Sequence, residues 1–488
     1  MMRRILPRLL SESAIYGLGG MASQAAAIIL VPIYVPVLGR AEYGVVSLIN
    51  TTLSLSLMAA GLALPQAFFR WYLKESETRG QRADVVAPTM LLRVVASTAA
   101  SGLMLLLAAP LVGVLGVEQD LPAFLVIAPI LFFDSLNQIP LSVLRAERRP
   151  AAYVVIAFGR AILGSIFIVV GVVVLRLGPL GLVLGSATAA LAATVTGLIV
   201  LQRAGLLRLR WDPALNRAML GFSLPLVPAA IAGWTLNLSD RYILQASRGA
   251  ETVGVYSLGY TVGLMINAFV IAPFTLTWGA AYWELSKQEG VRHAFSRIMT
   301  GFVAVASLVA LVLSAFGTDA IRLFVPSFEP ARYVVPFSAF AYVLYGVYTI
   351  ATTGLNLESQ TRWLPLTLAV AAVGNVVLNL LLIPPFGFMG AAYATLASYA
   401  VLALLSGGVS QRFYPVPWDY GRLIAILLVG IGLAEASILG PDLVAWRALC
   451  VVAFVPLLLL GRVVSMREIA TVGTVVSGGR IGPRGERR

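Results

Sequence analysis

The chain has 488 residues, of which 59% are hydrophobic and 12% are charged, and its formal net charge is +13. Because soluble domains carry about 25% charged residues, this composition excludes a soluble protein and predicts an all-α polytopic membrane protein. The basic residues fall in short clusters between apolar segments, which indicates membrane topology rather than nucleic-acid binding. The single cysteine, Cys450, rules out an internal disulfide and a cysteine-based metal site.

Membrane-spanning helices are predicted wherever about 20 mostly apolar residues follow one another, because the hydrocarbon core is about 30 Å thick and each residue rises about 1.5 Å. Fourteen stretches meet this condition, and the first is too long for the apolar part of a secretory signal. The predicted spans are 13–37, 44–67, 85–109, 121–143, 151–175, 179–201, 217–237, 252–277, 297–316, 333–353, 363–384, 388–409, 421–440 and 443–462.

The connectors between these spans predict the orientation of the chain. Basic residues in the connectors on the side of the N-terminus outnumber those on the other side by roughly four to one. Since cytoplasmic loops carry the excess of lysine and arginine, both termini are predicted to be cytoplasmic. The protein is therefore expected to be a multi-pass protein of the cytoplasmic membrane.

Nearly the same phrase occurs twice, as GRAEYGVVSL at 39–48 and GAETVGVYSL at 249–258. The segments LGPLGL and FGFMGA repeat two glycines at almost the same offset. Both pairs lie at matching points of two six-helix series, which predicts two parallel lobes with a substrate site between them. The phrase is predicted to be a helix-entry turn whose glycines, Gly44 and Gly254, permit close packing. The predicted parts are an N-terminal six-helix lobe (1–201), a cytoplasmic linker (202–216), a C-terminal six-helix lobe (217–410), helices 13 and 14 (411–463) and a basic cytoplasmic tail (464–488).

Two six-helix lobes followed by two further helices resemble the multidrug/oligosaccharidyl-lipid/polysaccharide (MOP) exporter superfamily. The sequence is similar to its polysaccharide biosynthesis branch, the Wzx-type oligosaccharide flippases. Three segments carry this resemblance: YVPVLGRAEYGVVSL, LRAERRP, and LPLVPAAIAGWTLNLSDRYIL followed by GAETVGVYSLGY.

The resemblance implies a flippase that moves a polyprenyl-(pyro)phosphate-linked oligosaccharide across the cytoplasmic membrane by alternating access, for cell-surface polysaccharide synthesis. The implied partners are the lipid-linked glycan, membrane lipids, and a polysaccharide polymerase with its chain-length machinery. No cofactor is implied, and a coupling ion, H⁺ or Na⁺, stays open. The sequence contains no nucleotide-binding loop, metal-ligand cluster or nucleophile elbow, so it does not predict an enzyme.

Two sister branches of the superfamily remain as alternatives. A cation-coupled drug antiporter often has an acidic residue in its first helix, but nothing acidic lies between Ser13 and Arg40. A lipid II-type flippase tends to have arginines in that helix, and here Gln24 is present without an arginine between Ser13 and Arg40. Outside the superfamily, a membrane glycan polymerase or ligase is disfavoured because the chain has no long outer loop.

Three charged residues are predicted near the middle of the membrane: Arg93, Asp134 and Arg160. A charge at this depth is costly, so each is a candidate functional residue. Arginine binds phosphate through two parallel hydrogen bonds and stays protonated, which suits a cavity for the (pyro)phosphate of the cargo. Asp134 is the candidate for ion coupling. The alternative is that one arginine pairs with Asp134 and only holds helices together.

Polar residues in the spans complete the predicted site. They suit sugar hydroxyls if they line the cavity, and otherwise they hydrogen-bond neighbouring helices. Asp240 and Arg241, which match a DR pair of the family, are predicted to form an outer ion pair or gate contact. Pro225 and Pro228 are the predicted hinge. The predicted cavity residues beside the three charges are Gln24, Asn50, Gln66, Asn137, Asn267, Asn375 and Asn379.

Overall fold

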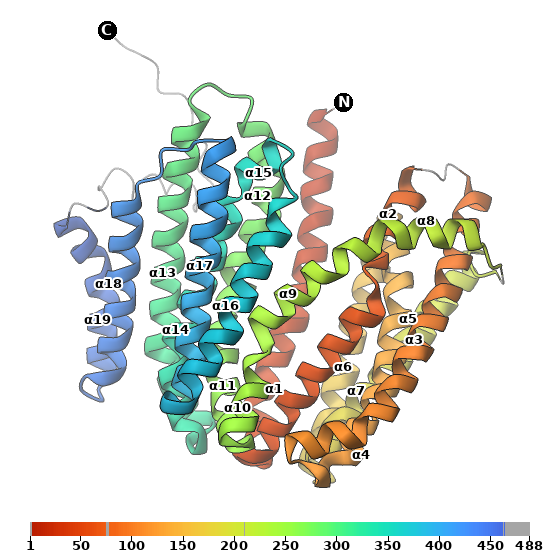
Figure 1. Ribbon diagram of the computed structural model, residues 1–488, viewed down its shortest axis with the longest axis horizontal. Helices are drawn as coiled ribbons and strands as arrows, with labels where there is room; N and C mark the ends of the chain where they lie inside the picture. The colour runs from red at the N-terminus through yellow and green to blue at the C-terminus, as the bar shows by residue number, and fades with distance from the viewer. Residues whose placement is uncertain (1, 75–77, 209, 462, 464–488) are drawn as a thin grey trace. The chain divides into compact units, whose positions relative to one another are not determined.

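The computed structural model describes residues 2–74, 78–208, 210–461 and 463, without the side chains of residues 2–28, Lys74 and Ala280. Every secondary-structure element in this part of the chain is helical (Figure 1). Among these described residues, twelve helices are long and apolar enough to cross a membrane, and the shorter α19 (Val444–Leu460) is apolar as well. The predicted all-α membrane fold is therefore confirmed.

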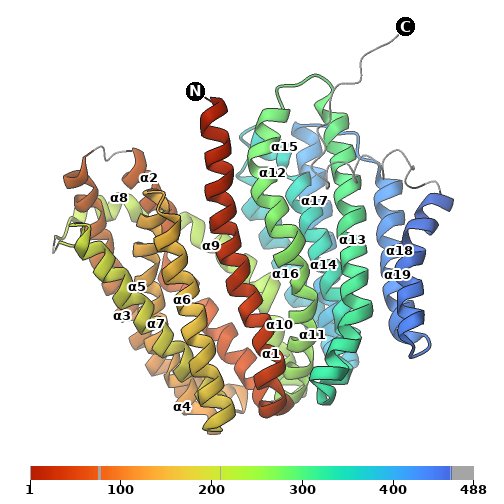
Figure 2. The same cartoon turned by 180° about the vertical axis from the view of Figure 1, so that it is seen from behind.

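The predicted number of about fourteen helices is consistent with these twelve spans. The helix α1 (Met2–Gly61) contains the first predicted helix and most of the second, which are separated by a kink at Gly39 with φ 71° and ψ −178°. Such a positive φ favours glycine. Figure 2 shows the chain reversing direction at this kink. Counting the two parts of α1 separately and adding α19 reconciles the structure with the prediction.

The chain forms two compact units. The first unit comprises residues 1–257, 324–328 and 368–391, and the second comprises 258–323, 329–367 and 392–488. The predicted lobe limits at residues 201 and 217 stay a prediction, and the tail 464–488 lies outside the described residues.

In the first unit, α3, α5, α6 and α7 run side by side in both views (Figures 1 and 2). Its helices are α1, α2 (Leu64–Lys74), α3 (Arg79–Leu115), α4 (Leu121–Leu125), α5 (Ile127–Ala146), α6 (Pro150–Val169), α7 (Gly178–Arg203), α8 (Pro213–Ser223), α9 (Val227–Leu238), α10 (Asp240–Arg248), the start of α11 (Ala250–Ile266) and most of α16 (Trp363–Phe386).

In the second unit, α11 continues through a π-helical segment, Asn267–Ile271, which packs against α14. α18 packs against both α14 and α19. The further helices of this unit are α12 (Ala272–Leu285), α13 (Val291–Phe324), α14 (Val334–Ala351), α15 (Thr353–Leu357), most of α17 (Phe388–Phe413), α18 (Tyr420–Leu439) and α19.

The predicted hinge prolines lie where the seventh span changes its helix type. α8 ends at Ser223, a 3₁₀ turn covers Leu224–Leu226, and α9 begins at Val227. Pro225 lies in the 3₁₀ turn and Pro228 in the first turn of α9. Proline is tolerated at such positions because the N–H groups of a first turn have no partner within the helix. A hinge role for the two prolines stays a prediction.

The repeated phrase packs against its own second copy inside the first unit. A Cβ atom added to Gly44 would lie 1.9 Å from the carbonyl oxygen of Ala250, and one added to Gly254 would lie 2.1 Å from that of Arg40. The hydroxyls of Ser47 and Ser257 are 2.7 Å apart. These contacts are reciprocal, because Arg40 and Ala250, Gly44 and Gly254, and Ser47 and Ser257 occupy equivalent positions of the two copies. Glycine lets the two helix backbones approach to this distance.

Gly254→Ala is expected to destabilise the protein by about 1–3 kcal/mol, because the added methyl group forces two backbones apart in a packed crossing. The matched control is Gly102→Ala, since a Cβ atom there meets nothing within 4 Å. Thermal unfolding of the purified protein, followed by tryptophan fluorescence, measures the difference. Equal melting temperatures for the two variants would contradict the close crossing.

Candidate functional site

Arg93 lies on α3 and is fully buried. Its Nε donates to the carbonyl of Ser135 at 3.0 Å, and its Nη2 donates to Oε1 of Gln138 at 2.6 Å. Its Nη1 donates to the carbonyls of Gly61 at 2.5 Å and Ala60 at 3.3 Å. The guanidinium therefore joins two consecutive turns of α5 to the end of α1.

The end of α1 explains this arrangement. The helix stops at Gly61, and Leu62 and Ala63 have positive φ values of 48° and 49° before α2 begins at Leu64. Pro65 has no N–H group, so it cannot bond to the carbonyl of Gly61 as the fourth residue along a helix would. The last carbonyls of a helix carry partial negative charge and attract cations. Arg93 acts as a side-chain cap for a broken membrane helix.

Arg160 and Asp134 form the ion pair that joins α6 to α5. Nε of Arg160 donates to Oδ1 of Asp134 at 2.7 Å, and Nη2 donates to Oδ2, so the pair is bidentate. The Arg160 side chain is 34% exposed and that of Asp134 is 14% exposed. The structure thus brings together one predicted arginine and the predicted carboxylate, and about a third of the arginine side chain stays accessible.

The three predicted charges are connected through α5. Asp134, Ser135 and Gln138 are neighbours on this helix, and they bond to Arg160 on one side and Arg93 on the other. Asp134 neutralises Arg160, whereas Arg93 is held by neutral oxygens. This part of the first unit therefore keeps one uncompensated positive charge within a membrane-spanning region, which can attract an anion.

The predicted polar residues lie on several elements of the two units. Asn137 is buried on α5, where its Oδ1 would lie 3.1 Å from a Cβ atom added to Gly197 of α7. Asn50 and Gln66 are exposed on α1 and α2. The side chain of Gln24 lies outside the described residues.

The other three asparagines lie on later elements. Asn375 and Asn379 are buried on α16, and Nδ2 of Asn379 donates to Oδ1 of Asn375 at 2.9 Å. That bond agrees with the alternative of local hydrogen bonding. Asn267 is half-buried and begins the π-helical segment of the second unit.

Asp240 and Arg241 form the expected ion pair at the start of α10. Nη1 of Arg241 donates to Oδ1 of Asp240 at 2.9 Å and to the carbonyl of Asn237 at 3.0 Å, and both side chains are buried. The Tyr256 hydroxyl donates to Oδ2 of Asp240, and the Arg241 guanidinium lies 5.5 Å from the centre of the Tyr256 ring. The pair thus fastens α10 to α11, and a role in gating stays a prediction.

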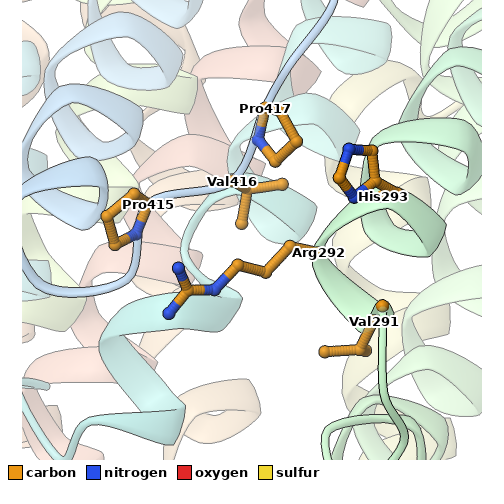
Figure 3. Close-up of a pocket in the computed structure, with 7 residues that line it drawn as sticks. Val291, Arg292, His293, Pro415, Val416 and Pro417 are labelled. Carbon is orange, nitrogen blue, oxygen red and sulfur yellow. The ribbon is translucent and has the colours of Figure 1, made fainter.

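A hollow that sequence reasoning missed lies at one end of the second unit (Figure 3). It is lined by Gly290–His293 at the start of α13 and by Pro415–Pro417 after α17, with Arg292 extending between the two segments. The Arg292 guanidinium lies 4.8 Å from the centre of the Tyr414 ring. Gln411 holds the second segment through two bonds to the backbone of Val416, at 2.7 and 2.8 Å.

A row of tyrosines on α14 was also missed. Tyr342, Tyr345 and Tyr348 recur every three residues, a spacing that places them along one side of a helix. The signal was present in the sequence, but a search for charges and amides does not select aromatic residues.

Comparison with known proteins identifies the family. Residues 9–278, more than half of the chain, match the profile of the polysaccharide biosynthesis protein family. A probable low-salt glycan biosynthesis flippase, Agl15 of Haloferax volcanii, is 24% identical over 219 residues, which cover 42% of this chain and 44% of that protein. An uncharacterized membrane protein of Methanocaldococcus jannaschii, MJ1068, is 22% identical over 34% of this chain and 32% of its own length. The matched region spans less than half the length of either relative.

Solved structures agree on the fold. The lipid II flippase MurJ in an inward-closed conformation gives a TM-score of 0.70 at 12% identity, covering 92% of this chain and 97% of that one. An inward-facing multidrug resistance MATE family transporter of the MOP superfamily gives 0.66 at 15% identity, covering 82% and 95%. The chain thus has the fold of the MOP superfamily and is a multi-pass membrane protein. By the extent of its match, it belongs to the polysaccharide biosynthesis protein family.

Proposed function

We propose that the protein is a flippase that moves a polyprenyl-(pyro)phosphate-linked oligosaccharide across the cytoplasmic membrane by alternating access. Membership of the polysaccharide biosynthesis family carries this proposal. The glycan biosynthesis flippase of Haloferax volcanii supports it through partial similarity. The basic connectors support a chain with both termini in the cytoplasm.

The charges of the first unit suit the anionic group of such a cargo. Moving a phosphate through hydrocarbon unaided is prohibitive, because the charge loses its hydration. Arg160 can replace that hydration, since its side chain is partly accessible and a guanidinium matches two phosphate oxygens. Arg93 is fully buried and bonded to carbonyls, so it contributes its field rather than direct contact.

Asp134 then acts as a competitor for Arg160. While the carboxylate is ionised it accepts hydrogen bonds from Nε and Nη2 of the arginine, and a proton or a sodium ion bound to it weakens that pair and releases these groups for phosphate. In this proposal, ion binding at Asp134 and cargo binding at Arg160 favour one another. The sugar chain meets polar and aromatic side chains, and the polyprenyl tail stays in lipid.

Reconstitution tests the proposal directly. Proteoliposomes are prepared with undecaprenyl-pyrophosphoryl-N-acetylgalactosamine, and the sugar that reaches the outer leaflet is titrated with a membrane-impermeant lectin. Wild-type protein is expected to raise the fraction of lectin-accessible sugar above that of protein-free liposomes. The control variant Arg412→Ala, which changes an exposed residue, is expected to behave like the wild type. Equal lectin binding with and without protein, for glycan lipids of several sugar types, would overturn the proposal.

A further inference from the structure

A pair of stacked tyrosines lies midway along a membrane span of the second unit. Tyr345 and Tyr348, called here the tyrosine pair, have ring centroids 5.8 Å apart and an interplanar angle of 26°. Both side chains are half-buried on α14. They precede the end of the span Pro326–Leu357 by about 18 and 13 Å at 1.5 Å per residue, so both rings lie at the depth of the hydrocarbon core.

The hydroxyls of the tyrosine pair have accessible oxygens, and neither forms a hydrogen bond with another group in the part of the chain that the structure describes. Lipid tails offer no hydrogen-bonding partner, so a hydroxyl left alone at this depth is costly. Water or a polar ligand must therefore meet these hydroxyls. The same reasoning applies to the half-buried Asn267, whose side chain bonds to no described group.

Asn267 lies at the same height as Tyr342, the first residue of the tyrosine row on α14. A Cβ atom added to Gly263 would touch Oγ of Ser338, and one added to Gly346 would lie 3.3 Å from Cδ1 of Ile271. These two contacts show that residues 263–271 run alongside residues 338–346. Asn267 is midway between them and so falls at the height of Tyr342, one turn from Tyr345.

Two other tyrosines, Tyr342 and Tyr399, pack against the ring of Tyr345. The Tyr260 and Tyr342 hydroxyls are 3.0 Å apart and buried. The buried ring of Tyr399 lies 5.9 Å from that of Tyr345 at an interplanar angle of 77°, and Tyr342 lies 6.4 Å from it at 80°. Edge-to-face contacts of this kind hold an aromatic ring in one orientation. The tyrosine pair is therefore a preorganised surface rather than a loose one.

We infer that the tyrosine pair, with Asn267 beside it, is the surface that contacts the sugars of the cargo. A pyranose ring presents a face of C–H groups, which packs on the electron-rich face of an aromatic ring, and an edge of hydroxyls, which pairs with phenol and amide groups. This inference rests on the proposed function. It goes further by naming the sugars as the part of the cargo that this surface recognises.

Binding of two lipids separates the inference from the proposed function. The probes are undecaprenyl pyrophosphate, bare or carrying glucose, galactose or N-acetylglucosamine, each titrated against protein in nanodiscs and read by native mass spectrometry. Wild-type protein is expected to prefer at least one sugar-bearing lipid over the bare lipid about tenfold. Tyr345→Leu and Tyr348→Leu are expected to remove that preference while bare undecaprenyl pyrophosphate still binds.

Two further variants complete the test. Tyr345→Phe keeps the ring and loses the hydroxyl, so it is expected to retain part of the preference. Tyr342→Phe is the control, because it removes the buried bond to Tyr260 without reaching the accessible surface, and it is expected to match the wild type.

Each contrary outcome has its own meaning. A wild-type preference that survives in both leucine variants would overturn the inference and leave the flippase proposal intact. A wild type that shows no preference for any sugar-bearing lipid would overturn both. Aromatic faces also bind lipophilic cations, so loss of tetraphenylphosphonium binding in the leucine variants, with no sugar preference in the wild type, would assign the surface to drug transport instead.

Discussion

Replacing Arg160 with alanine is expected to abolish glycan-lipid translocation and to lower the stability of the protein. The substitution removes the guanidinium and leaves Asp134 as an unpaired carboxylate within a membrane-spanning region. Removing one partner of a buried pair costs about 3–5 kcal/mol. The cost here is expected to be smaller, because the Arg160 side chain is 34% exposed. Lectin titration of proteoliposomes and thermal unfolding measure the two effects.

A double variant separates transport from helix packing. In Asp134→Asn/Arg160→Gln both charges are removed together, so no unpaired charge remains, and the melting temperature is expected to recover most of the loss. Translocation is expected to stay absent, because glutamine cannot neutralise a phosphate. Wild-type translocation by this double variant would show that the pair only joins α5 to α6 and would remove Arg160 from the mechanism.

Arg93→Ala is expected to destabilise the protein more than Arg160→Ala does. Arg93 satisfies the carbonyls of Ala60, Gly61 and Ser135 together with the amide of Gln138. Each buried acceptor left without a partner costs about 1–3 kcal/mol, and water is scarce at this depth. The expected result is a lower yield of folded protein and a melting temperature below that of the Arg160 variant.

Arg93→Lys and Val95→Ala serve as controls for this expectation. Lysine keeps a cation near the end of α1 but lacks the planar fork, so it is expected to restore only part of the stability. Val95 is 58% exposed on the same helix, and its truncation is expected to leave the melting temperature almost unchanged. If Arg93→Ala unfolds like the wild type yet fails to translocate, Arg93 contacts the cargo and is not primarily a helix cap.

The sequence predicts a depth for the charged residues and an arginine partner for Asp134, but not which arginine that partner is. Counting residues from a loop locates Arg93, Asp134 and Arg160 near mid-membrane, because a helix advances by a constant rise. Which arginine meets Asp134 depends on how each helix is rotated about its axis and on which neighbour it packs against. Depth is a property of one segment, whereas pairing belongs to several segments at once.

The break between α1 and α2 shows the same limit. The apolar run 44–67 predicts one continuous helix, since hydropathy does not register the positive φ values of Leu62 and Ala63. Pro65 was a local sign of the interruption. Its consequence, a helix end capped by a residue from α3, requires the folded chain.

The sequence by itself determined the membrane class, the all-α fold, the approximate number of helices and the family. The length of the apolar runs, the distribution of basic residues and the repeated segments are all properties of consecutive residues, so they can be recognised without the folded structure. The tertiary structure alone decided that the two repeated phrases pack on one another, that Arg160 rather than Arg93 holds Asp134, and that the tyrosine pair keeps accessible hydroxyls within a span. The reason is that these features depend on which faces of separate helices come together, and close packing selects those faces only when the whole chain has folded.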